Sequence, residues 1–378
     1  MKTLSSPALP LLLHLQGTAG FGGDESNSTL LIRHLAGHRH HVAVNFREGP
    51  MSAEWGRLGA EVTSLDLLSR SRRSIPGTIA SLVDRLQPSA VFLSSISLLP
   101  LFLKGLEGCH GPVLVHTGNP NALSRLARLK FRAARWLLRP RTPAIMVHCS
   151  QYVAATYAAD PLFRGYRHNV AVSAGVVAPN VPYVARSRAP GQPLVVGMTA
   201  RLDRIKNHAL VLEAWPAVLR AWPEARLEFV GDGDERAFLQ ARTQRLGIAA
   251  AVTFHGRVPE TVPIMQCWDL FVYATSASEG FGAALAEAMA LGLPCIVTDI
   301  GPMREVGGEA GAVHYVPADN PVALAGAILA LGQDGEERQR LSAQGAERAK
   351  LDFRGEIFAL KIGRIIADAR LRSAQLNP

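Results

Sequence analysis

Two carboxylates and a pair of glycines give the strongest chemical signal in the sequence. Glu279 stands directly before Gly280-Phe281-Gly282, and Glu287 follows Glu279 with seven residues between them. A loop bracketed by glycines lets backbone N–H groups approach a ligand closely. A helix that begins near Phe281 would add the partial positive charge of its N-terminus, which suits a diphosphate. One carboxylate could then contact one end of a bound molecule and the other a more distant part.

Two cations form the second signal. Arg201 and Lys206 come directly after an apolar run at residues 194–198, in the segment Gly197–His208. Cations in this position could neutralise a leaving diphosphate without a metal. A single Arg or Lys in a loop is commonly a solvated surface charge, but the presence of both motifs in one half of the chain favours the binding hypothesis.

The N-terminal half offers a glycine loop and a histidine. Gly17–Gly23 directly follows an apolar run at residues 11–15, but Glu25 stands where the dinucleotide fingerprint requires glycine or alanine. His116 ends another apolar run, at residues 112–116, and α/β folds bind ligands at such strand ends. Taken alone, the glycine loop is more typical of a plain turn, and His116 is more typical of a structural histidine.

The elements that must position these residues form two series. Short apolar runs alternate with helical patterns along the whole chain, which is typical of parallel strands buried on both faces. These runs are residues 11–15, 41–46, 90–93, 112–116, 144–148, 194–198, 226–230, 251–255, 270–273 and 294–298. The series break near residues 184–193, where no apolar period exists. We expect an α/β protein with two Rossmann-like, doubly wound domains that face each other across a cleft. The predicted boundaries are 1–185 for the first domain and 186–355 for the second, with a C-terminal helix at 356–378.

Composition restricts the class of protein. The 378 residues are 48% hydrophobic and 19% charged, which argues against a disordered chain, and this length predicts about two domains. No apolar stretch reaches the roughly 18 residues that a membrane-spanning helix needs. The four cysteines include no Cys-x-x-Cys pair, which favours reduced thiols in the cytoplasm over a disulfide framework or a zinc site.

Two groups that could suggest a metal site are interpreted otherwise. Asp232-Gly233-Asp234 spells an Asp-x-Asp motif, but it stands in a turn after an apolar run. His34, His38, His40 and His41 have no carboxylate or cysteine among them. We therefore expect no metal and no cofactor.

A basic helix is expected at residues 123–139. The net charge of the protein is +9, and residues 108–159 contain no Asp or Glu. Five arginines with spacing 3, 4, 3, 4 would share one stripe of the helix, beside apolar residues: Arg125, Arg128, Arg132, Arg135 and Arg139. Such a helix could bind an anionic membrane surface or an acidic substrate, or it could be a solvated face. Few aromatic residues interleave with the arginines, so nucleic acid is not the expected partner.

The pattern Arg-x4-Lys at Arg201 and Lys206, followed by Glu-x7-Glu at Glu279 and Glu287, resembles the retaining glycosyltransferases of the GT-B fold, family 4 (glycosyl transferases group 1). The resemblance is closest over residues 195–320. The chain departs from the family at residues 173–177, where Asn-Gly-Val-Asp is usual, and at Gly301-Pro302, where Gly-Gly is frequent.

The resemblance implies that residues 1–185 bind the acceptor, that residues 186–355 bind the nucleotide sugar, and that the C-terminal helix at 356–378 packs back on the first domain. It also implies a role for each matching residue. Arg201 and Lys206 would bind the donor's diphosphate, Glu279 its sugar hydroxyls and Glu287 its ribose hydroxyls. His116 would lie near the reacting carbon, and the catalytic set would comprise His116, Arg201, Lys206 and Glu279. The remaining donor contacts would come from the glycine loops, the following helix and a strand end: Gly22, Gly23, Arg257, Val258, Gly280, Phe281, Gly282, Ala283 and Ala284.

The resemblance also implies a reaction. The protein would move a sugar from a nucleoside-diphosphate sugar to a hydroxyl of a sugar or lipid-linked acceptor, with retained configuration and without a metal. Polysaccharide, lipopolysaccharide or glycolipid synthesis would be its setting, in the cytoplasm or at the inner face of the membrane. The alternatives are an epimerase or phosphorylase on the same scaffold and a non-catalytic protein that binds nucleotide sugars or nucleic acid.

Overall fold

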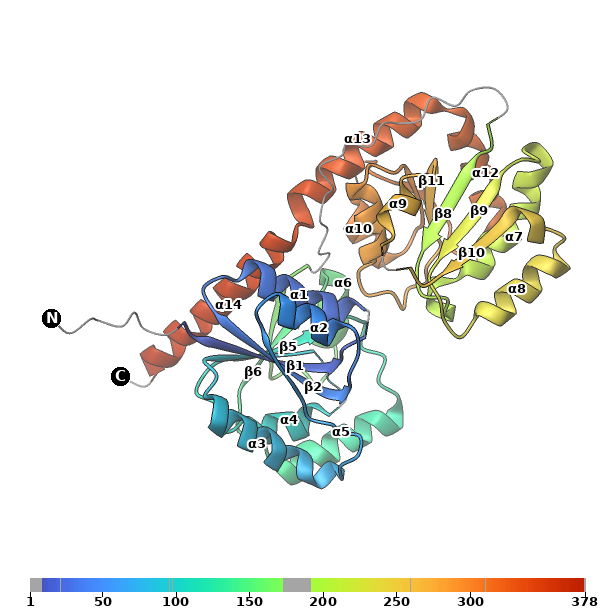
Figure 1. Cartoon of the computed structure of the whole chain (residues 1–378). Coiled ribbons are helices and arrows are strands. Elements are labelled where there is room, and N and C mark those ends of the chain that lie inside the picture. Colours follow the sequence, from blue (N-terminus) through green and yellow to red (C-terminus); the bar gives the residue numbers. More distant parts are fainter. Residues whose placement is uncertain are drawn as a thin grey trace. The chain divides into compact units, whose positions relative to one another are not determined.

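The chain folds into two compact units (Figure 1). The computed structural model describes residues 9–20, 22–94, 96, 98–172, 192–258, 260–309 and 311–376. Unit 1 comprises Met1–Gly175 together with Gly355–Pro378, and unit 2 comprises Val176–Arg354. The predicted boundary between residues 185 and 186 lies outside the described residues. Of the described helices, none is long and apolar enough to cross a membrane.

Unit 1 is built on a seven-stranded parallel sheet with the strand order β3-β2-β1-β4-β5-β6-β7. The strands are β1 (Leu11–Thr18), β2 (Arg39–Arg47), β3 (Glu61–Ser64), β4 (Ala90–Leu93), β5 (Val113–Thr117), β6 (Ala144–His148) and β7 (Arg167–Val170). Its helices are α1 (Gly23–His34), α2 (Met51–Arg57), α3 (Ile75–Leu86), α4 (Leu99–Gly105), α5 (Arg125–Leu138), α6 (Gln151–Ala158) and α14 (Gly355–Leu376), with a short 3₁₀ helix η1 (Arg72–Ser74).

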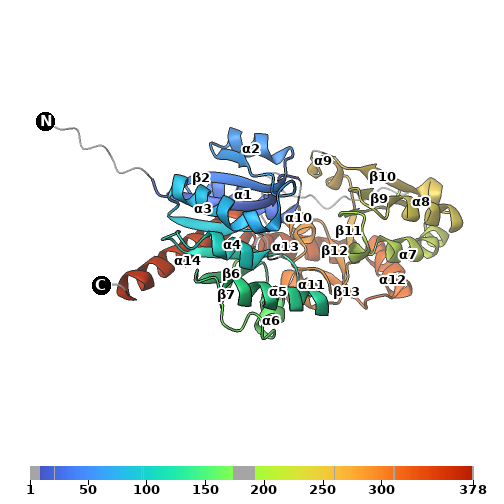
Figure 2. The same cartoon turned by 90° about the horizontal axis from the view of Figure 1, so that it is seen from below.

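Helices cover both faces of this sheet (Figures 1 and 2). The helices α3, α4 and α5 lie side by side on one face, and α1 and α14 cover the other. Leu12, Phe92 and Leu114 lie on the neighbouring strands β1, β4 and β5. They belong to one hydrophobic core, to which α14 contributes Phe358 and Ile362. Residues far apart in the sequence therefore share one hydrophobic core in unit 1.

Unit 2 has a six-stranded parallel sheet with the order β10-β9-β8-β11-β12-β13. The strands are β8 (Val195–Thr199), β9 (Arg226–Val230), β10 (Val252–Gly256), β11 (Leu270–Tyr273), β12 (Cys295–Thr298) and β13 (His314–Val316). The helices are α7 (His208–Ala221), α8 (Arg236–Arg245), α9 (Val262–Met265), α10 (Ala283–Ala290), α11 (Gly301–Gly307), α12 (Pro321–Gln333) and α13 (Gly335–Asp352), with 3₁₀ turns η2 (Arg204–Lys206) and η3 (Ala249–Ala251). Trp268 lies so close to Gly197 that a Cβ there would be 2.0 Å from the indole, which explains the glycine inside β8.

Each sheet has one point at which the strand order reverses. In unit 1 the reversal lies between β1 and β4, and in unit 2 between β8 and β11. Open α/β sheets bind ligands beyond the carboxyl ends of the strands at such points, because the two flanking loops diverge to opposite faces. The predicted glycine loop of unit 1 follows β1, and the segments that carry Arg201, Lys206, Glu279 and Glu287 follow β8 and β11.

Candidate active site

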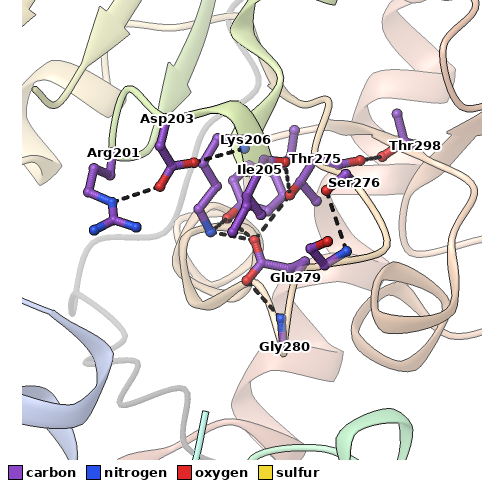
Figure 3. Close-up of polar contacts among 11 residues, drawn as sticks. Arg201, Asp203, Ile205, Lys206, Thr275, Ser276, Glu279, Gly280 and Thr298 are labelled. Carbon is purple, nitrogen blue, oxygen red and sulfur yellow. Dashed lines mark hydrogen bonds and ion pairs between the residues drawn. The ribbon is translucent and has the colours of Figure 1, made fainter. Parts of the chain in front are cut away.

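A buried ion pair joins the loops that follow β8 and β11 (Figure 3). The ammonium of Lys206 pairs with Glu279, and Lys206 Nζ also lies 2.9 Å from Tyr273 Oη. The Tyr273 hydroxyl donates to Glu279 Oε2 at 2.9 Å, and the Gly280 amide donates to Oε1 at 3.1 Å. Thr275 Oγ1 lies 3.2 Å from Glu279 Oε2 and 3.0 Å from the carbonyl oxygen of Ile205. The predicted residues Lys206 and Glu279 thus meet at the strand-order reversal of unit 2.

Opposing effects set the pKa of Glu279. Burial alone would raise the pKa of this carboxyl, because it disfavours the charged form. The charge of Lys206 and the hydrogen bonds from Lys206, Tyr273 and the Gly280 amide outweigh burial and lower the pKa. The pKa of Tyr273 is raised well above its usual value, by burial first and by the charge of Glu279 second. Glu279 is therefore an ionised acceptor and Tyr273 a neutral donor at physiological pH.

Arg201 and Lys206 are linked through Asp203. Arg201 Nε donates to Asp203 Oδ2 at 2.7 Å, and the Lys206 amide donates to Asp203 Oδ1 at 3.1 Å, which caps η2. The Arg201 side chain is 70% exposed. One carboxylate therefore holds the turn that carries both predicted cations, while the guanidinium keeps most of its surface available.

The glycine loop ends in a helix N-terminus. Gly282 caps α10 with φ +89°, and a Cβ at this position would lie 2.6 Å from the Met303 methyl group. Among the described residues, no acceptor is bonded to the amides of Ala283 and Ala284. Phe281 is buried and packs edge-to-face on Phe353, which anchors the loop. The helix begins two residues later than predicted, because the left-handed Gly282 cannot continue a right-handed helix.

Glu287 lies on α10 without a hydrogen-bond partner or ion pair among the residues that the structure describes. It is half-buried, and its burial raises the pKa to about 7. A carboxyl group in a largely apolar setting is costly to ionise unless donors reach it. Glu287 therefore keeps unused hydrogen-bonding capacity on α10.

The other predicted donor contacts of unit 2, Arg257 and Val258, lie at the carboxyl end of an edge strand. Arg257 and Val258 directly follow β10, two strands from β8 in the sheet. Gly301 and Pro302 open α11 after β12. Residues 173–177, where the sequence departs from the family, lie outside the described part of the chain.

Unit 1 places His116 beside the glycine loop. His116 is buried at the carboxyl end of β5, and its Nδ1 lies 3.3 Å from Asp24 Oδ1. Gly22 and Gly23 begin α1 directly before Asp24, and Asn27, one turn further, has its Nδ2 3.4 Å from His116 Nδ1. The structure thus brings the predicted Gly22, Gly23 and His116 together through two side chains of α1.

A cavity of about 290 Å³ opens at His116. Its lining includes Asp24, Asn119 and Asn121 together with Tyr157 and Leu123. Charged and amide side chains that converge on a cavity of this kind fix the orientation of a polar ligand. This cavity is the candidate ligand site of unit 1, at the carboxyl ends of its strands.

Sequence reasoning missed several residues of both sites. The sequence pattern identifies Tyr273 only as the last residue of an apolar strand. Its hydroxyl group at the carboxyl end of that strand could have suggested a place in the site. Asp203 and Thr275 act on Arg201, Lys206 and Glu279 through contacts that no spacing encodes. Asp24 and Asn27 have the helical spacing of one α1 face and follow Gly23 directly, which could have suggested them.

The histidines near the N-terminus pair in other ways. His14 Nε2 lies 3.0 Å from His40 Nδ1, and His41 Nδ1 lies 3.1 Å from Glu61. Asp232 accepts from the Gly233 amide at 2.9 Å and pairs with Arg236. Within the described ranges, no group of three or more His, Cys, Asp or Glu side chains could hold a metal ion.

A family model matches the part of the chain that carries the unit 2 site. Residues 183–348 match the family described as glycosyl transferases group 1. Phosphatidyl-myo-inositol mannosyltransferase from Mycobacterium leprae is 33% identical over 147 residues, which are 38% of this chain and 38% of the relative. D-inositol 3-phosphate glycosyltransferase from Corynebacterium urealyticum is 32% identical over 174 residues, 43% of this chain and 41% of the relative. The chain thus aligns with about two fifths of the length of these curated relatives.

Solved structures resemble the chain over nearly its whole length. The crystal structure of Anabaena HepE in complex with UDP and glucose has a TM-score of 0.74 at 18% identity, covering 95% of this chain and 99% of that one. A glycosyltransferase from Rickettsia africae has a TM-score of 0.77 at 14% identity, with 95% and 98% covered. Together with the two parallel-sheet units, this likeness confirms the predicted GT-B fold.

Proposed function

We propose that this protein is a glycosyltransferase, on the premise that its residues 183–348 belong to the glycosyl transferases group 1. The observation that carries the proposal is the buried Lys206–Glu279 pair at the strand-order reversal of unit 2, next to the unbonded amides of α10. A cation, a carboxylate and free amides in one place match a donor that combines a diphosphate with a hydroxyl-rich sugar. The first reaction to test is transfer from a nucleoside-diphosphate sugar.

The proposed reaction exchanges one bond for another at the anomeric carbon. The acceptor hydroxyl oxygen bonds to that carbon as its bond to the diphosphate oxygen breaks, and the hydroxyl proton moves to the departing nucleoside diphosphate. Arg201, Lys206 and the amides of Ala283 and Ala284 stabilise the negative charge that grows on the diphosphate. Attack from the side on which the diphosphate leaves retains the configuration.

We assign Glu279 to positioning the sugar. Its carboxylate already accepts from Lys206, Tyr273 and Gly280, so a sugar hydroxyl would enter an oriented set of groups. Retaining glycosidases instead use a pair of carboxyl groups about 5 Å apart, one of them a nucleophile. Trapping of a covalent glycosyl–Glu279 species by mass spectrometry would contradict the assignment.

We place Glu287 at the donor's ribose and His116 at the acceptor side of the reaction. Glu287 is an unpartnered acceptor on α10, the helix whose N-terminus would receive the phosphates. His116 opens into a polar cavity in unit 1, where Asp24, Asn119 and Asn121 can bind acceptor hydroxyls. This division gives the donor to unit 2 and the acceptor to unit 1.

An anionic membrane surface is the proposed location of the reaction. The outward face of α5 exposes Leu129 by 63% and Trp136 by 70%, beside the exposed Arg125 and Arg132. Two further arginines of the predicted stripe are engaged within unit 1, since Arg128 pairs with Asp160 and Arg135 donates to the Leu162 carbonyl. Basic helices with an exposed apolar face bind at the headgroup boundary of anionic membranes. Sedimentation should therefore be stronger with vesicles of equal parts phosphatidylcholine and phosphatidylglycerol than with phosphatidylcholine alone.

The decisive experiment has two stages. Thermal unfolding is first followed with UDP, GDP, ADP, dTDP or CMP in the presence of EDTA, and one nucleoside diphosphate should raise the melting temperature. UDP comes first, because the Anabaena structure contains it. The matching nucleotide sugars are then supplied with candidate acceptors, and the anomeric configuration of the product is read by NMR.

The outcomes separate the alternatives. A new glycosidic bond with retained configuration in EDTA supports the proposal, whereas loss of activity in EDTA that manganese restores contradicts its metal-free form. A changed sugar without an acceptor would identify an epimerase. Glu279→Gln should abolish transfer while circular dichroism remains that of the wild type.

A further inference from the structure

The helices α4 and α5 enclose a second cavity in unit 1, of about 510 Å³, with mainly apolar walls. Leu98 and Leu101 line it from the start of α4, Phe131 lines it from α5, and Phe46 does so from the end of β2. Its volume lies within the range of pockets that hold small molecules. Apolar walls that remain accessible are costly in water, which indicates an apolar occupant.

This cavity adjoins the cavity at His116. Ile96 and Leu123 line both, so the two hollows share a wall within the same unit. A molecule that extends past these two side chains would place one end among Asp24, Asn119 and Asn121, and the other among the leucines of α4. The pair of cavities is therefore polar at one end and apolar at the other.

Two cations also line the apolar cavity. Lys130 on α5 and Arg72 on η1 are both exposed at its boundary, and none of its described lining residues is acidic. An exposed cation beside apolar walls matches a molecule that carries a negative charge next to a hydrocarbon.

We infer that the α4–α5 cavity binds the hydrocarbon chain of an anionic lipid acceptor, whose hydroxyl-bearing headgroup reaches the His116 cavity. This inference rests on the proposed glycosyl transfer and specifies its acceptor class. Arg72 and Lys130 bind the lipid's negatively charged group, and Leu98, Leu101 and Phe131 contact its chain.

The test compares lipid binding with headgroup binding. Isothermal titration of the full chain without nucleotide uses dioctanoylphosphatidic acid, glycerol 3-phosphate and dioctanoylglycerol as probes. The expected affinity for dioctanoylphosphatidic acid exceeds that for each of the other two by about tenfold or more. Equal affinity for glycerol 3-phosphate would show a headgroup site alone and would overturn the inference.

Neighbouring alanines of α5 provide matched variants. Ala134 lines the cavity, whereas Ala133 is exposed on the outward face. Ala134→Phe should weaken binding of dioctanoylphosphatidic acid about tenfold by filling the cavity, and Ala133→Phe should not weaken it. If the two variants weaken binding equally, the lipid adsorbs to the surface and the inference fails. Circular dichroism checks both folds, and Ala127→Leu is the smaller cavity-filling change if Ala134→Phe does not fold.

The outcome is independent of the proposed function. Nucleotide binding is measured on the same samples without lipid. Lipid binding that is lost in Ala134→Phe but kept in Ala133→Phe supports the cavity even if no sugar is transferred. Transfer to a water-soluble acceptor without lipid binding would overturn the inference alone and leave the glycosyltransferase proposal in place.

Discussion

The hydroxyl of Tyr273 explains how a lysine and a glutamate can stay charged inside unit 2. It donates to Glu279 and lies 2.9 Å from Lys206 Nζ, while the Gly280 amide supplies a further hydrogen bond. A buried ion pair is tolerated when its remaining hydrogen-bonding capacity is satisfied in this way. The pair is therefore a fixed polar platform on which a ligand binds.

Removal of one member of the pair should destabilise unit 2 strongly. Lys206→Met leaves the carboxylate of Glu279 buried without its counter-charge, and breaking such pairs costs about 3–5 kcal/mol. The double variant Lys206→Met/Glu279→Gln should recover part of this free energy, because it removes the uncompensated charge. Urea unfolding of the wild type, both single variants and the double variant measures the coupling. Additive single effects would contradict the interaction.

Glu287 should make nucleotide binding depend on pH. Its pKa is raised to about 7, so the carboxyl is mostly protonated at pH 6 and ionised at pH 8. The ionised form accepts ribose hydroxyls, so affinity should fall by about tenfold per pH unit below the pKa. Titrations from pH 5 to 8 with the wild type and with Glu287→Gln measure this, and the variant should bind weakly with a flat profile.

The same carboxyl should lower stability at high pH. Because the folded pKa exceeds the unfolded value, the native state holds a proton that the unfolded state releases between these two values. The contribution of Glu287 to the free energy of unfolding therefore decreases as the pH rises from 4.5 to about 7. Glu287→Gln should raise the melting temperature at pH 8 and leave it nearly unchanged at pH 4. An equal effect at both values would mean that burial does not perturb this carboxyl.

Sequence reasoning found the charged residues of the site but not the neutral ones. Lys206 belongs to the Arg-x4-Lys pattern and Glu279 to the Glu-x7-Glu pattern, both of which resemble a known family, and charge makes the two residues conspicuous. Tyr273 and Thr275 are common in strands, and only the pairing of β8 with β11 brings them to the ion pair. Tertiary contacts therefore supply the information that the spacing lacks.

At the scale of elements, α10 depends on one glycine. Gly282→Ala would force an unfavourable φ and place a Cβ 2.6 Å from Met303. The loop that carries Glu279 and Gly280 should shift, so nucleotide binding should weaken about tenfold or more at unchanged helix content. Gly326→Ala on α12 is the matched control, because open space surrounds that position. The control should bind normally and gain about 0.5–1 kcal/mol of stability. Normal binding by Gly282→Ala would show that the loop tolerates the change.

The strands show what a pattern of apolar runs can and cannot predict. The runs at 90–93, 144–148, 226–230 and 270–273 coincide with β4, β6, β9 and β11. Apolar runs did not predict β3, β7 and β13, the edge strands Glu61–Ser64, Arg167–Val170 and His314–Val316. Edge strands are short and polar because one side faces water, so they lack the signal of strands buried on both faces.

At the scale of the whole molecule, α14 determines the stability of unit 1. A chain that ends at Arg354 lacks Phe358, Ile362 and Ile366, which are buried in the unit 1 core. Burial of such side chains stabilises a fold by roughly 2 kcal/mol each, and a domain has only about 5–15 kcal/mol in total. Unit 1 of the truncated chain should therefore lose protection from hydrogen exchange, while unit 2 keeps it.

A chain that ends at Arg372 is the control for this truncation, because the side chains of residues 373–375 are exposed. It should retain protection in both units. Full protection of unit 1 in the chain that ends at Arg354 would show that its sheet is stable without α14.

The return of α14 to unit 1 has a consequence during synthesis on the ribosome. The sheet of unit 1 emerges first, but the helix that covers one of its faces is translated only after all of unit 2. At a translation rate of about 5–20 residues per second, α14 follows on the order of ten seconds or more after this face is made. Unit 2 has all its elements between Val195 and Asp352 and can complete its fold earlier. We therefore expect chaperones to bind the nascent first half during this interval. Slow translation of the second half would prolong the exposure of this face and lower the solubility of the first half.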